Sequence, residues 1–243
     1  MTTTRGRLDQ MLVDRGLAES RQKAQALVLA GQVLVDGERI DKAGRRVDGA
    51  SRIEVTGRLP YVSRGGRKLE AALDHFRIVV AGRVCLDVGA STGGFTDCLL
   101  QRDAARVYAV DTGAGQIDWK LRTDPRVRLR ENCNARYLRP QDLGEGIELA
   151  VCDVSFISAT LILPALAAVL VESGEMVILV KPQFEVGRGQ VGKGGVVREP
   201  ELHREACDRV EGAARALGFR TGLIESPIRG AEGNREFLLY ACH

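Results

Sequence analysis

The sequence predicts an α/β protein in which a doubly wound, mainly parallel sheet ends in an antiparallel strand and is preceded by a small α+β domain. Short apolar runs alternate with segments of helical length, as expected when crossover helices join parallel strands, at residues 84–88, 107–110, 127–129, 149–152 and 176–180. Two further strands near residues 219–226 and 236–240 follow a helix over 199–217. With no helix between them, these two strands must pair in antiparallel orientation.

The composition excludes several classes of protein. Of the 243 residues, 44% are hydrophobic, enough for a packed core, so the chain is neither disordered nor fibrous. No apolar run reaches the roughly 18–20 residues of a membrane span, and none follows the N-terminal charges as in a signal peptide, so we expect a cytoplasmic protein. The six cysteines are widely spaced and only three histidines accompany them, so neither a disulfide framework nor a metal site is predicted.

Positive charge is concentrated near the N-terminus. Residues 1–68 hold 14 Lys and Arg against 8 Asp and Glu, whereas the remaining residues hold 21 against 24. A basic module on a mildly acidic body is typical of a protein that docks on a polyanion, because neutralised phosphates release their counterions. Nucleic acid is the natural polyanion.

The first 55 residues predict two helices followed by strands. Apolar residues have helical spacing in residues 8–17 and 21–29, and they alternate with other residues in 33–35 and 52–55. Ser20 can cap the second helix, and Asp36-Gly37 is a hairpin turn signal, with a loop over residues 41–51. The basic residues of this module lie at the second helix and the hairpin: Arg21, Lys23, Arg39, Lys42, Arg45 and Arg46. They could line one phosphate-facing surface or only form a solvated face.

The pattern Arg7-Leu8-Asp9, then Gly16 to Arg21 and Gly31 to Gly37, resembles the S4-type RNA-binding domain. All eleven aromatic residues of the chain fall at or after Tyr61, so this module has no ring on which an unstacked base could sit. We therefore expect it to read RNA backbone and shape rather than base sequence.

The two parts are joined by a glycine-rich stretch, residues 56–66, which Pro60 also interrupts. The predicted domains are residues 1–59, an S4-type RNA-binding domain, and residues 67–243, with residues 60–66 as the linker. A helical pattern from Lys68 opens the second domain.

A glycine loop, residues 87–95, follows the first strand of the second domain and opens a helix, where such sheets bind ligands. A dinucleotide site would need glycine at position 91, which is serine. The same residues spell G-x-S-x-G, and Asp153 and His203 follow in the order of an α/β-hydrolase. A nucleophile elbow normally comes after several strands rather than after the first, so a hydrolase is disfavoured.

S-adenosylmethionine (SAM) suits this loop better, because a site for its cationic amine and sulfonium can carry an acid. Asp87 would be that acid, and Asp111, which closes the second strand, lies where ribose hydroxyls need an acceptor. Either acid could instead only cap a turn or a helix. The predicted cofactor-binding residues are Asp87, Gly89, Ala90, Ser91, Gly93, Gly94, Phe95 and Asp111.

A second glycine-rich segment, residues 187–193, has the spacing of a phosphate-binding loop, but Gly194 stands where Ser or Thr should bind magnesium. ATP hydrolysis is therefore disfavoured. Arg188 and Lys193 make this segment basic, so it is either a lid over an RNA substrate or a plain flexible loop.

Four polar residues stand at ends of elements that border the same crevice: Lys68, Asp153, Lys181 and Glu236. Lys181 ends an apolar run, where a lysine is costly unless it is paired or functional. A salt bridge between Lys181 and Asp153 is the structural alternative to a catalytic role.

The second domain resembles the FtsJ-like ribose 2′-O-methyltransferases, whose Lys-Asp-Lys-Glu tetrad these four residues match in order and element. With the S4-type front end, nearly the whole chain is similar to the TlyA, or hemolysin-A-type, family. The resemblance implies a Rossmann-like SAM-dependent fold with a seven-stranded sheet whose last strand is antiparallel. It also implies 2′-O-methylation of cytidine in ribosomal RNA within an assembled ribosomal subunit.

A 2′-hydroxyl is a poor nucleophile, so positioning and partial deprotonation are what the protein can add. Lys181 is the residue expected to accept or steer the hydroxyl proton. Either it is nearly neutral in the closed complex, or the charged tetrad orients the hydroxyl and the proton leaves to water. The full set of predicted RNA contacts adds Arg7, Arg64, Arg67, Arg188 and Lys193 to the basic residues named above.

The sequence carries no extension beyond the last strand, and by resemblance this favours a cytidine of the large subunit. Two rival functions stay open. One is a non-catalytic RNA- or ribosome-binding factor that merely holds the cofactor, and the other is a membrane-active hemolysin, for which no amphipathic segment provides support.

Overall fold

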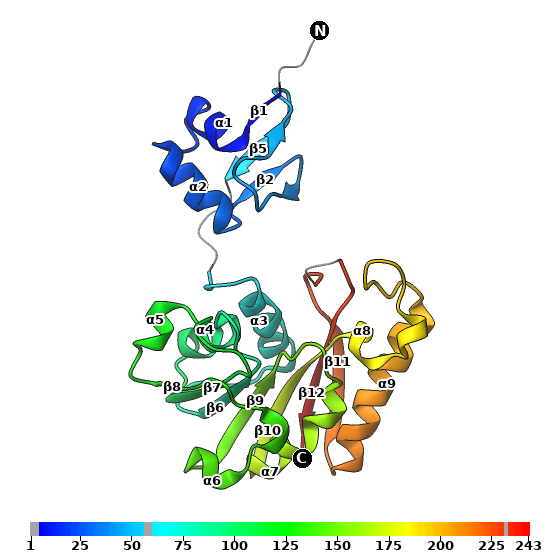
Figure 1. Ribbon diagram of the computed structural model, residues 1–243. Helices are drawn as coiled ribbons and strands as arrows, with labels where there is room; N and C mark the ends of the chain where they lie inside the picture. Colours follow the sequence, from blue (N-terminus) through cyan, green and yellow to red (C-terminus); the bar gives the residue numbers. More distant parts are fainter. Residues whose placement is uncertain (1–4, 56–59, 231–232) are drawn as a thin grey trace. The chain divides into compact units, whose positions relative to one another are not determined.

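The computed structural model describes residues 5–55, 60–230 and 233–243. The chain divides into two compact units, residues 1–60 and 61–243 (Figure 1). Each unit has a hydrophobic core of its own.

The N-terminal unit packs two helices, α1 (Leu8–Asp14) and α2 (Arg21–Leu29), against short strands. The predicted second helix is confirmed residue for residue, and the Ser20 hydroxyl accepts a hydrogen bond from the Lys23 backbone N–H at 3.2 Å. The first helix ends at Asp14, just before Gly16, the residue that the sequence marks as its end. The strands of the main sheet are β2 (Val33–Val35), β3 (Glu38–Arg39) and β5 (Ile53–Val55), with β2 in the middle.

A second, two-stranded sheet is absent from the predicted elements, and one of its strands lies inside the loop predicted over residues 41–51. Strand β1 (Gly6–Arg7) pairs in antiparallel orientation with β4 (Arg46–Val47), so that Arg7 lies opposite Arg46. Strands of two residues are too short to produce an alternating apolar pattern, which is why sequence periodicity does not reveal them.

The C-terminal unit is built on a seven-stranded sheet with the order β11-β12-β10-β9-β6-β7-β8 (Figure 1). The strands are β6 (Val84–Val88), β7 (Arg106–Val110), β8 (Val127–Arg130), β9 (Ile147–Cys152), β10 (Leu170–Val180), β11 (Arg220–Glu225) and β12 (Phe237–Cys242). Strand β12 lies between β10 and β11 and is antiparallel to both. The predicted fold class is therefore confirmed, although β10 begins six residues earlier than expected.

Helices cover both faces of this sheet, because alternate residues of each strand point to opposite sides. One face packs on α3 (Gly65–Phe76), α4 (Gly94–Gln101) and α5 (Trp119–Arg122). The other packs on α6 (Pro140–Leu143), α7 (Leu163–Val169) and α9 (Pro200–Ala216). In β9, for example, Leu149 and Val151 face the first layer while Ala150 and Cys152 face the second.

Helix α3 begins at Gly65, inside the stretch that the sequence assigns to the linker. The Tyr61 ring is buried, its hydroxyl donates to Glu70 at 2.7 Å, and a Cβ at Gly66 would lie 2.3 Å from the ring. Gly66 thus makes room for the Tyr61 ring against the helix, and neither Gly65 nor Gly66 breaks it. Residues 56–59 of the predicted linker stretch lie outside the described residues.

Candidate functional site

The glycine loop between β6 and α4 lies against the end of β9. Gly89 has a φ of +82°, and a Cβ there would lie 2.4 Å from the backbone oxygen of Asp153. Only glycine allows this backbone conformation and this close approach together. The loop after β6 and the loop after β9 therefore meet at one point, at the carboxyl edge of the sheet.

Two neighbouring cavities open beside this meeting point. The first has a volume of about 600 Å³ and the second about 450 Å³, and both are lined by Gly89, Ser91, Asp153, Ser155 and Phe156. Volumes of this size suit a small-molecule ligand. The shared walls mean that ligands in the two cavities would lie side by side.

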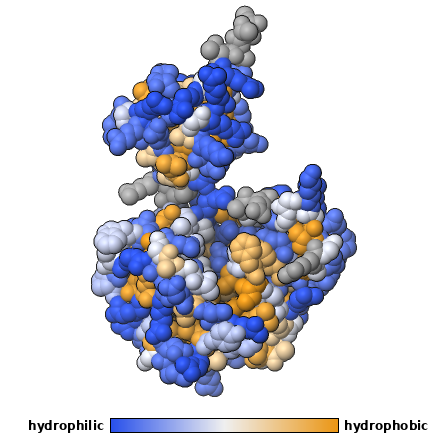
Figure 2. Space-filling view, viewed as in Figure 1, coloured by the Kyte–Doolittle hydropathy of each residue, from blue (hydrophilic) through white to orange (hydrophobic). Residues whose placement is uncertain are grey.

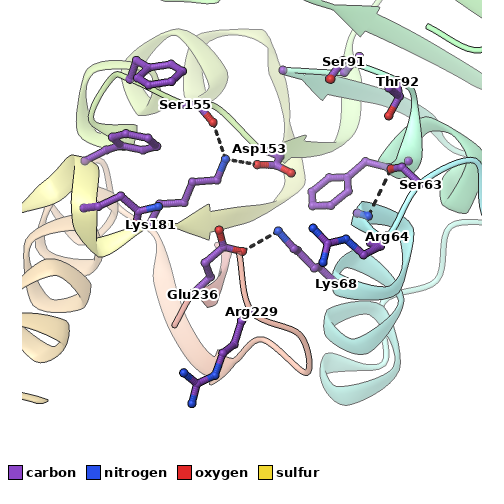
Figure 3. Close-up of a pocket in the computed structure, with 18 of the residues that line it drawn as sticks. Ser63, Arg64, Lys68, Ser91, Thr92, Asp153, Ser155, Lys181, Arg229 and Glu236 are labelled. Atoms are coloured by element: carbon purple, nitrogen blue, oxygen red, sulfur yellow. Dashed lines mark hydrogen bonds and ion pairs between the residues drawn. The ribbon is translucent and has the colours of Figure 1, made fainter. Parts of the chain in front are cut away.

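The first cavity brings together all four residues of the predicted tetrad (Figure 3). The Lys68 ammonium lies 2.6 Å from the Glu236 carboxylate, and the Lys181 ammonium lies 2.6 Å from the Asp153 carboxylate. Lys181 also donates to the Ser155 hydroxyl at 2.7 Å. Figure 3 shows the two ion pairs pointing into the same space.

Each member of the tetrad stands at the end of an element. Lys68 lies on the first turn of α3, and Asp153 directly follows β9. Lys181 follows β10 and precedes α8 (Pro182–Glu185), and Glu236 directly precedes β12. The side chain of Glu236 is only 3% exposed, so its negative charge is compensated inside the protein, by Lys68.

The second cavity contains Asp111, the predicted ribose acceptor, at the end of β7. Its two carboxylate oxygens accept hydrogen bonds from the backbone N–H groups of Ser91, at 2.8 Å, and Gly113, at 2.7 Å. Asp111 thus also ties the glycine loop to the loop after β7. Apolar side chains complete this cavity, among them Val110, Ala135 and Ile162.

The other predicted cofactor residues divide into two groups. Gly89, Ala90, Ser91, Gly94 and Phe95 line the first cavity, whereas Asp87 and Gly93 line neither cavity. Asp87 is fully buried and accepts a hydrogen bond from the Thr96 hydroxyl at 2.6 Å. Burial raises the pKa of Asp87 to about 7. Its position is beneath the loop rather than in the cavity wall.

Two aromatic side chains of the first cavity are absent from the sequence analysis. Phe156 is 92% exposed and has a φ of +65°, a conformation that is unusual for a bulky residue. Its ring lies 5.2 Å from that of Phe184, measured between centroids. An exposed ring in a strained position at a cavity mouth is typical of functional sites, but its sequence context, Asp-Val-Ser-Phe, gives no signal of exposure.

Arginines contribute positive charge to the same cavity. Arg64, a predicted RNA contact, lines it together with Arg229, which the sequence analysis does not single out. Arg229 lies in the loop between β11 and β12, a segment without periodicity. Arg67 and Lys193 are exposed but do not line this cavity, and the side chain of Arg188 lies outside the described residues.

The predicted lid segment, residues 187–193, is followed by residues that the side chain of Asn234 holds in place. The buried Asn234 side chain accepts from the Val197 backbone N–H at 3.0 Å and donates to the Gly195 carbonyl at 2.8 Å. Val191 and Gly195 line the first cavity. The segment follows a short helix and not a strand, unlike a phosphate-binding loop.

The residues of the hydrolase interpretation are not assembled. The His203 imidazole is buried on α9, with its Nε2 3.0 Å from the Val197 carbonyl, and it does not line the cavity that contains Ser91. In the described part of the chain, no three His, Cys, Asp or Glu side chains are grouped as metal ligands would be. No helix among these residues has both the length and the apolar composition to cross a membrane.

The predicted RNA contacts of the N-terminal unit are exposed with one exception. Arg7, Arg21, Lys23, Lys42, Arg45 and Arg46 are exposed, and Arg39 is partly buried and donates to the Ala30 carbonyl at 3.2 Å. Figure 2 shows hydrophilic side chains over most of the visible face of this unit. The exposed lysines and arginines give this surface the positive charge that a polyanion requires.

Comparison with known proteins finds two family models along the chain. The model of the FtsJ-like methyltransferase matches residues 61–242, and the model of the S4 domain matches residues 6–53. A relative from Mycobacterium tuberculosis, named 16S/23S rRNA (cytidine-2′-O)-methyltransferase TlyA, is 48% identical over 97% of this chain and 89% of its own length.

Solved structures are also similar. "Putative hemolysin from Streptococcus thermophilus" is 47% identical, covers 99% of this chain and 89% of its own, and has a TM-score of 0.77. A geranyl diphosphate methyltransferase in complex with SAM has a TM-score of 0.52 at 18% identity, over 73% of this chain and 84% of its own. The latter likeness concerns the fold alone.

Proposed function

The chain belongs to the FtsJ-like methyltransferase family and carries an S4 domain, and from this premise we propose that it methylates the ribose 2′-hydroxyl of a cytidine in ribosomal RNA, with SAM as methyl donor. The observation that supports this most is the convergence of Lys68, Asp153, Lys181 and Glu236 on one cavity as two ion pairs. A ribosomal substrate implies a cytoplasmic site of action.

The chemistry of the second cavity supports SAM as the cofactor. Asp111 offers carboxylate oxygens to ribose hydroxyls, and the apolar residues around it suit an adenine ring. Gly89 and Ser91 line both cavities, so the methionine part would lie along them, toward the tetrad. When bound, the cofactor supplies a methyl group on a positively charged sulfur. Asp87 would act from below, by fixing the loop through Thr96.

The tetrad is proposed to orient the nucleophile. Methyl transfer requires the ribose oxygen in line with the bond from sulfur to carbon, and correct orientation removes much of the barrier. Because Asp153 and Ser155 fix the Lys181 ammonium from two sides, it can donate to the 2′-oxygen and hold it in place. Lys68 and Glu236 would fix the opposite side of the ribose.

The ion pairs favour one of the two proton pathways. Each lysine of the tetrad lies 2.6 Å from a carboxylate, an arrangement that favours ammonium groups rather than a neutral base. The hydroxyl proton then leaves to water as the oxygen–carbon bond forms and the sulfur–carbon bond breaks.

Phe156 would support the target base, because an exposed ring at the cavity mouth can stack on a base taken out of its RNA helix.

The experiment measures transfer of a radioactive methyl group from SAM to purified ribosomal subunits from cells that lack this protein. Nucleoside analysis should identify 2′-O-methylcytidine. The small and large subunits are assayed separately, because the relative named above acts by name on both 16S and 23S rRNA. Modification of a large-subunit cytidine stays our prediction.

We expect Lys181→Met to lower kcat by at least about a hundredfold, since misplacing the reacting oxygen relative to the methyl group costs a rate factor on this scale. Binding of SAM and of the subunit should be unchanged. Lys42→Met, which removes an exposed lysine of the N-terminal unit, should raise KM and leave kcat intact. Near-normal transfer by Lys181→Met would refute the assignment.

The wild type tests the two rival functions. Subunit binding without any methyl transfer would indicate a non-catalytic factor, and leakage of liposomes would indicate a hemolysin.

A further inference from the structure

Asp9 is a buried acid among the basic residues of the N-terminal unit. Its side chain is 0% exposed and every hydrogen-bond partner is a donor. Oδ1 accepts from the Arg7 Nε at 3.0 Å and from the Gln10 backbone N–H at 2.9 Å. Oδ2 accepts from the Arg7 Nη2 at 2.8 Å, the Arg21 Nε at 3.0 Å and the Gln25 Nε2 at 3.0 Å.

Asp9 therefore joins two arginines that come from different elements. Arg7 lies on β1 and Arg21 is the first residue of α2. Their side chains are 47% and 52% exposed. Within the described part of the chain, Arg7 Nη1 and both Nη atoms of Arg21 donate no hydrogen bond, so each guanidinium keeps donors for an external acceptor.

Further features limit where the Arg7 guanidinium can lie. A Cβ at Gly44 would lie 3.2 Å from its Nη atoms, so the backbone of the loop before β4 passes directly beside it. Arg46 is the cross-strand partner of Arg7, and side chains in such pairs lie next to each other on one face of a sheet. Like charges in that arrangement repel unless an anion lies between or near them.

We propose that Asp9 is a positioning residue that holds the guanidinium groups of Arg7 and Arg21 side by side for a phosphate of RNA, so that this acid strengthens binding to a polyanion. A preorganised arginine loses less side-chain entropy on binding than a free one. The Asp9 carboxylate repels the phosphate only weakly, because hydrogen-bond donors cover it completely. Its hydrogen bonds with Arg7, together with Arg21 and Gln25, hold its pKa well below its usual range, so it stays ionised.

The inference rests on the proposed RNA-binding function. For the effect of Asp9→Asn on RNA affinity, it predicts the opposite of what the change in net charge alone predicts. Asp9→Asn removes a negative charge, so long-range electrostatics alone would tighten binding of RNA. Positioning predicts the reverse. We expect Asp9→Asn to weaken binding of purified large ribosomal subunits by about tenfold, the scale of a lost charge-assisted hydrogen bond. The slope of log Kobs against log salt should shrink by roughly 0.9 for each phosphate that the variant no longer neutralises.

Asp14→Asn is the matched control, because Asp14 is an exposed acid of the same unit whose carboxylate, among the residues that the structure describes, accepts only from Gln10. It should bind subunits no more weakly than the wild type. A double-mutant cycle then tests the route of the effect: in a chain with Arg7→Ala and Arg21→Ala, Asp9→Asn should cause no further loss. An equal loss in both backgrounds, or tighter binding by Asp9→Asn, would overturn the inference.

The outcomes separate this inference from the proposed function. If Arg7→Ala and Arg21→Ala leave subunit binding unchanged, the RNA-binding role of the arginines is wrong. If those variants bind weakly and Asp9→Asn binds normally, only the positioning role is wrong. Should Asp9→Asn lose its fold by circular dichroism, the wild type still provides a test by NMR. The Nε–H protons of Arg7 and Arg21 should exchange with water more slowly than that of Arg46, and equal exchange would refute the positioning.

Discussion

Asp87 lies at the end of β6, beneath the glycine loop, and one of its carboxylate oxygens has no hydrogen-bond partner in the described part of the chain. Burial is the main reason that its pKa rises to about 7, and the charges of Asp153 and Asp111 act in the same direction. Between about pH 4 and pH 7 the folded protein therefore binds a proton at this site that the unfolded chain does not.

This difference sets the sign of a pH effect. Since the folded state binds more protons, the contribution of Asp87 to the free energy of unfolding falls as pH rises through that window, by up to about 1.4 kcal/mol per pH unit. Asp87→Asn lacks this contribution. The stability of the variant relative to wild type, measured by urea unfolding, should therefore increase from pH 5 to pH 7 and then level off.

Asp208→Asn, at an exposed position of α9, is the control for the loss of an aspartate. The stability of Asp208→Asn relative to wild type should not change with pH. If that of Asp87→Asn is equally constant, the prediction is wrong.

Single residues differ in how well the sequence reveals them. Lys181 is conspicuous because it ends an apolar run, where a buried ammonium group is unfavourable unless it is paired or functional. Phe156 is not conspicuous, because its exposure depends on a left-handed backbone turn that no local pattern encodes. Asp9 appears in the sequence only as part of a motif. Its burial beneath two arginines follows from the packing of β1 and α2 against α1, which the spacing of residues does not reveal.

At the level of elements, the meeting of the β6 and β9 loops is the feature on which the site depends. Gly89→Ala should be strongly destabilising and should weaken SAM binding, because the new Cβ would lie 2.4 Å from the Asp153 carbonyl oxygen. Gly144→Ala is the matched control. Gly144 has a similar φ of +79° and open space around it, so its replacement should cost only the strain of the conformation, about 1 kcal/mol.

Isothermal titration with SAM and urea unfolding provide the two measurements. The expected result is a loss of SAM affinity for Gly89→Ala alone, with a larger loss of stability than in Gly144→Ala. Equal stability and equal SAM affinity in the two variants would mean that the close approach of the loops does not matter.

Elements were predictable where burial produces a clear apolar pattern in the sequence. The strands of the large sheet lie within a few residues of their predicted positions, because parallel strands covered on both faces are continuous apolar runs. The early start of β10 was not predictable, since its first part, Leu170 to Glu175, shifts register and contains charged residues. The pair of β1 and β4 depends on a partner forty residues away, which sequence periodicity cannot supply.

For the whole molecule, the two units have separate hydrophobic cores. The single tryptophan, Trp119, lies in the C-terminal unit, so tryptophan fluorescence reports only on that unit, whereas circular dichroism reports on both. We expect the two probes to give unfolding curves that do not coincide. Addition of SAM should move the fluorescence curve to higher urea concentration, because ligands stabilise the state that binds them.

The same denaturation without SAM is the control for the ligand effect. Coincident curves under all conditions would show that the two units unfold as one cooperative system, in spite of their separate cores.

The position of β12 has a consequence for biosynthesis. This strand is the last in sequence, yet it lies inside the sheet between β10 and β11, and Glu236 directly precedes it. During translation β11 emerges from the exit tunnel before the strand that joins it to the rest of the sheet. The catalytic unit therefore cannot complete its hydrogen-bonded framework until residues 237–242 have been released, whereas the N-terminal unit can fold while the nascent polypeptide is still being elongated.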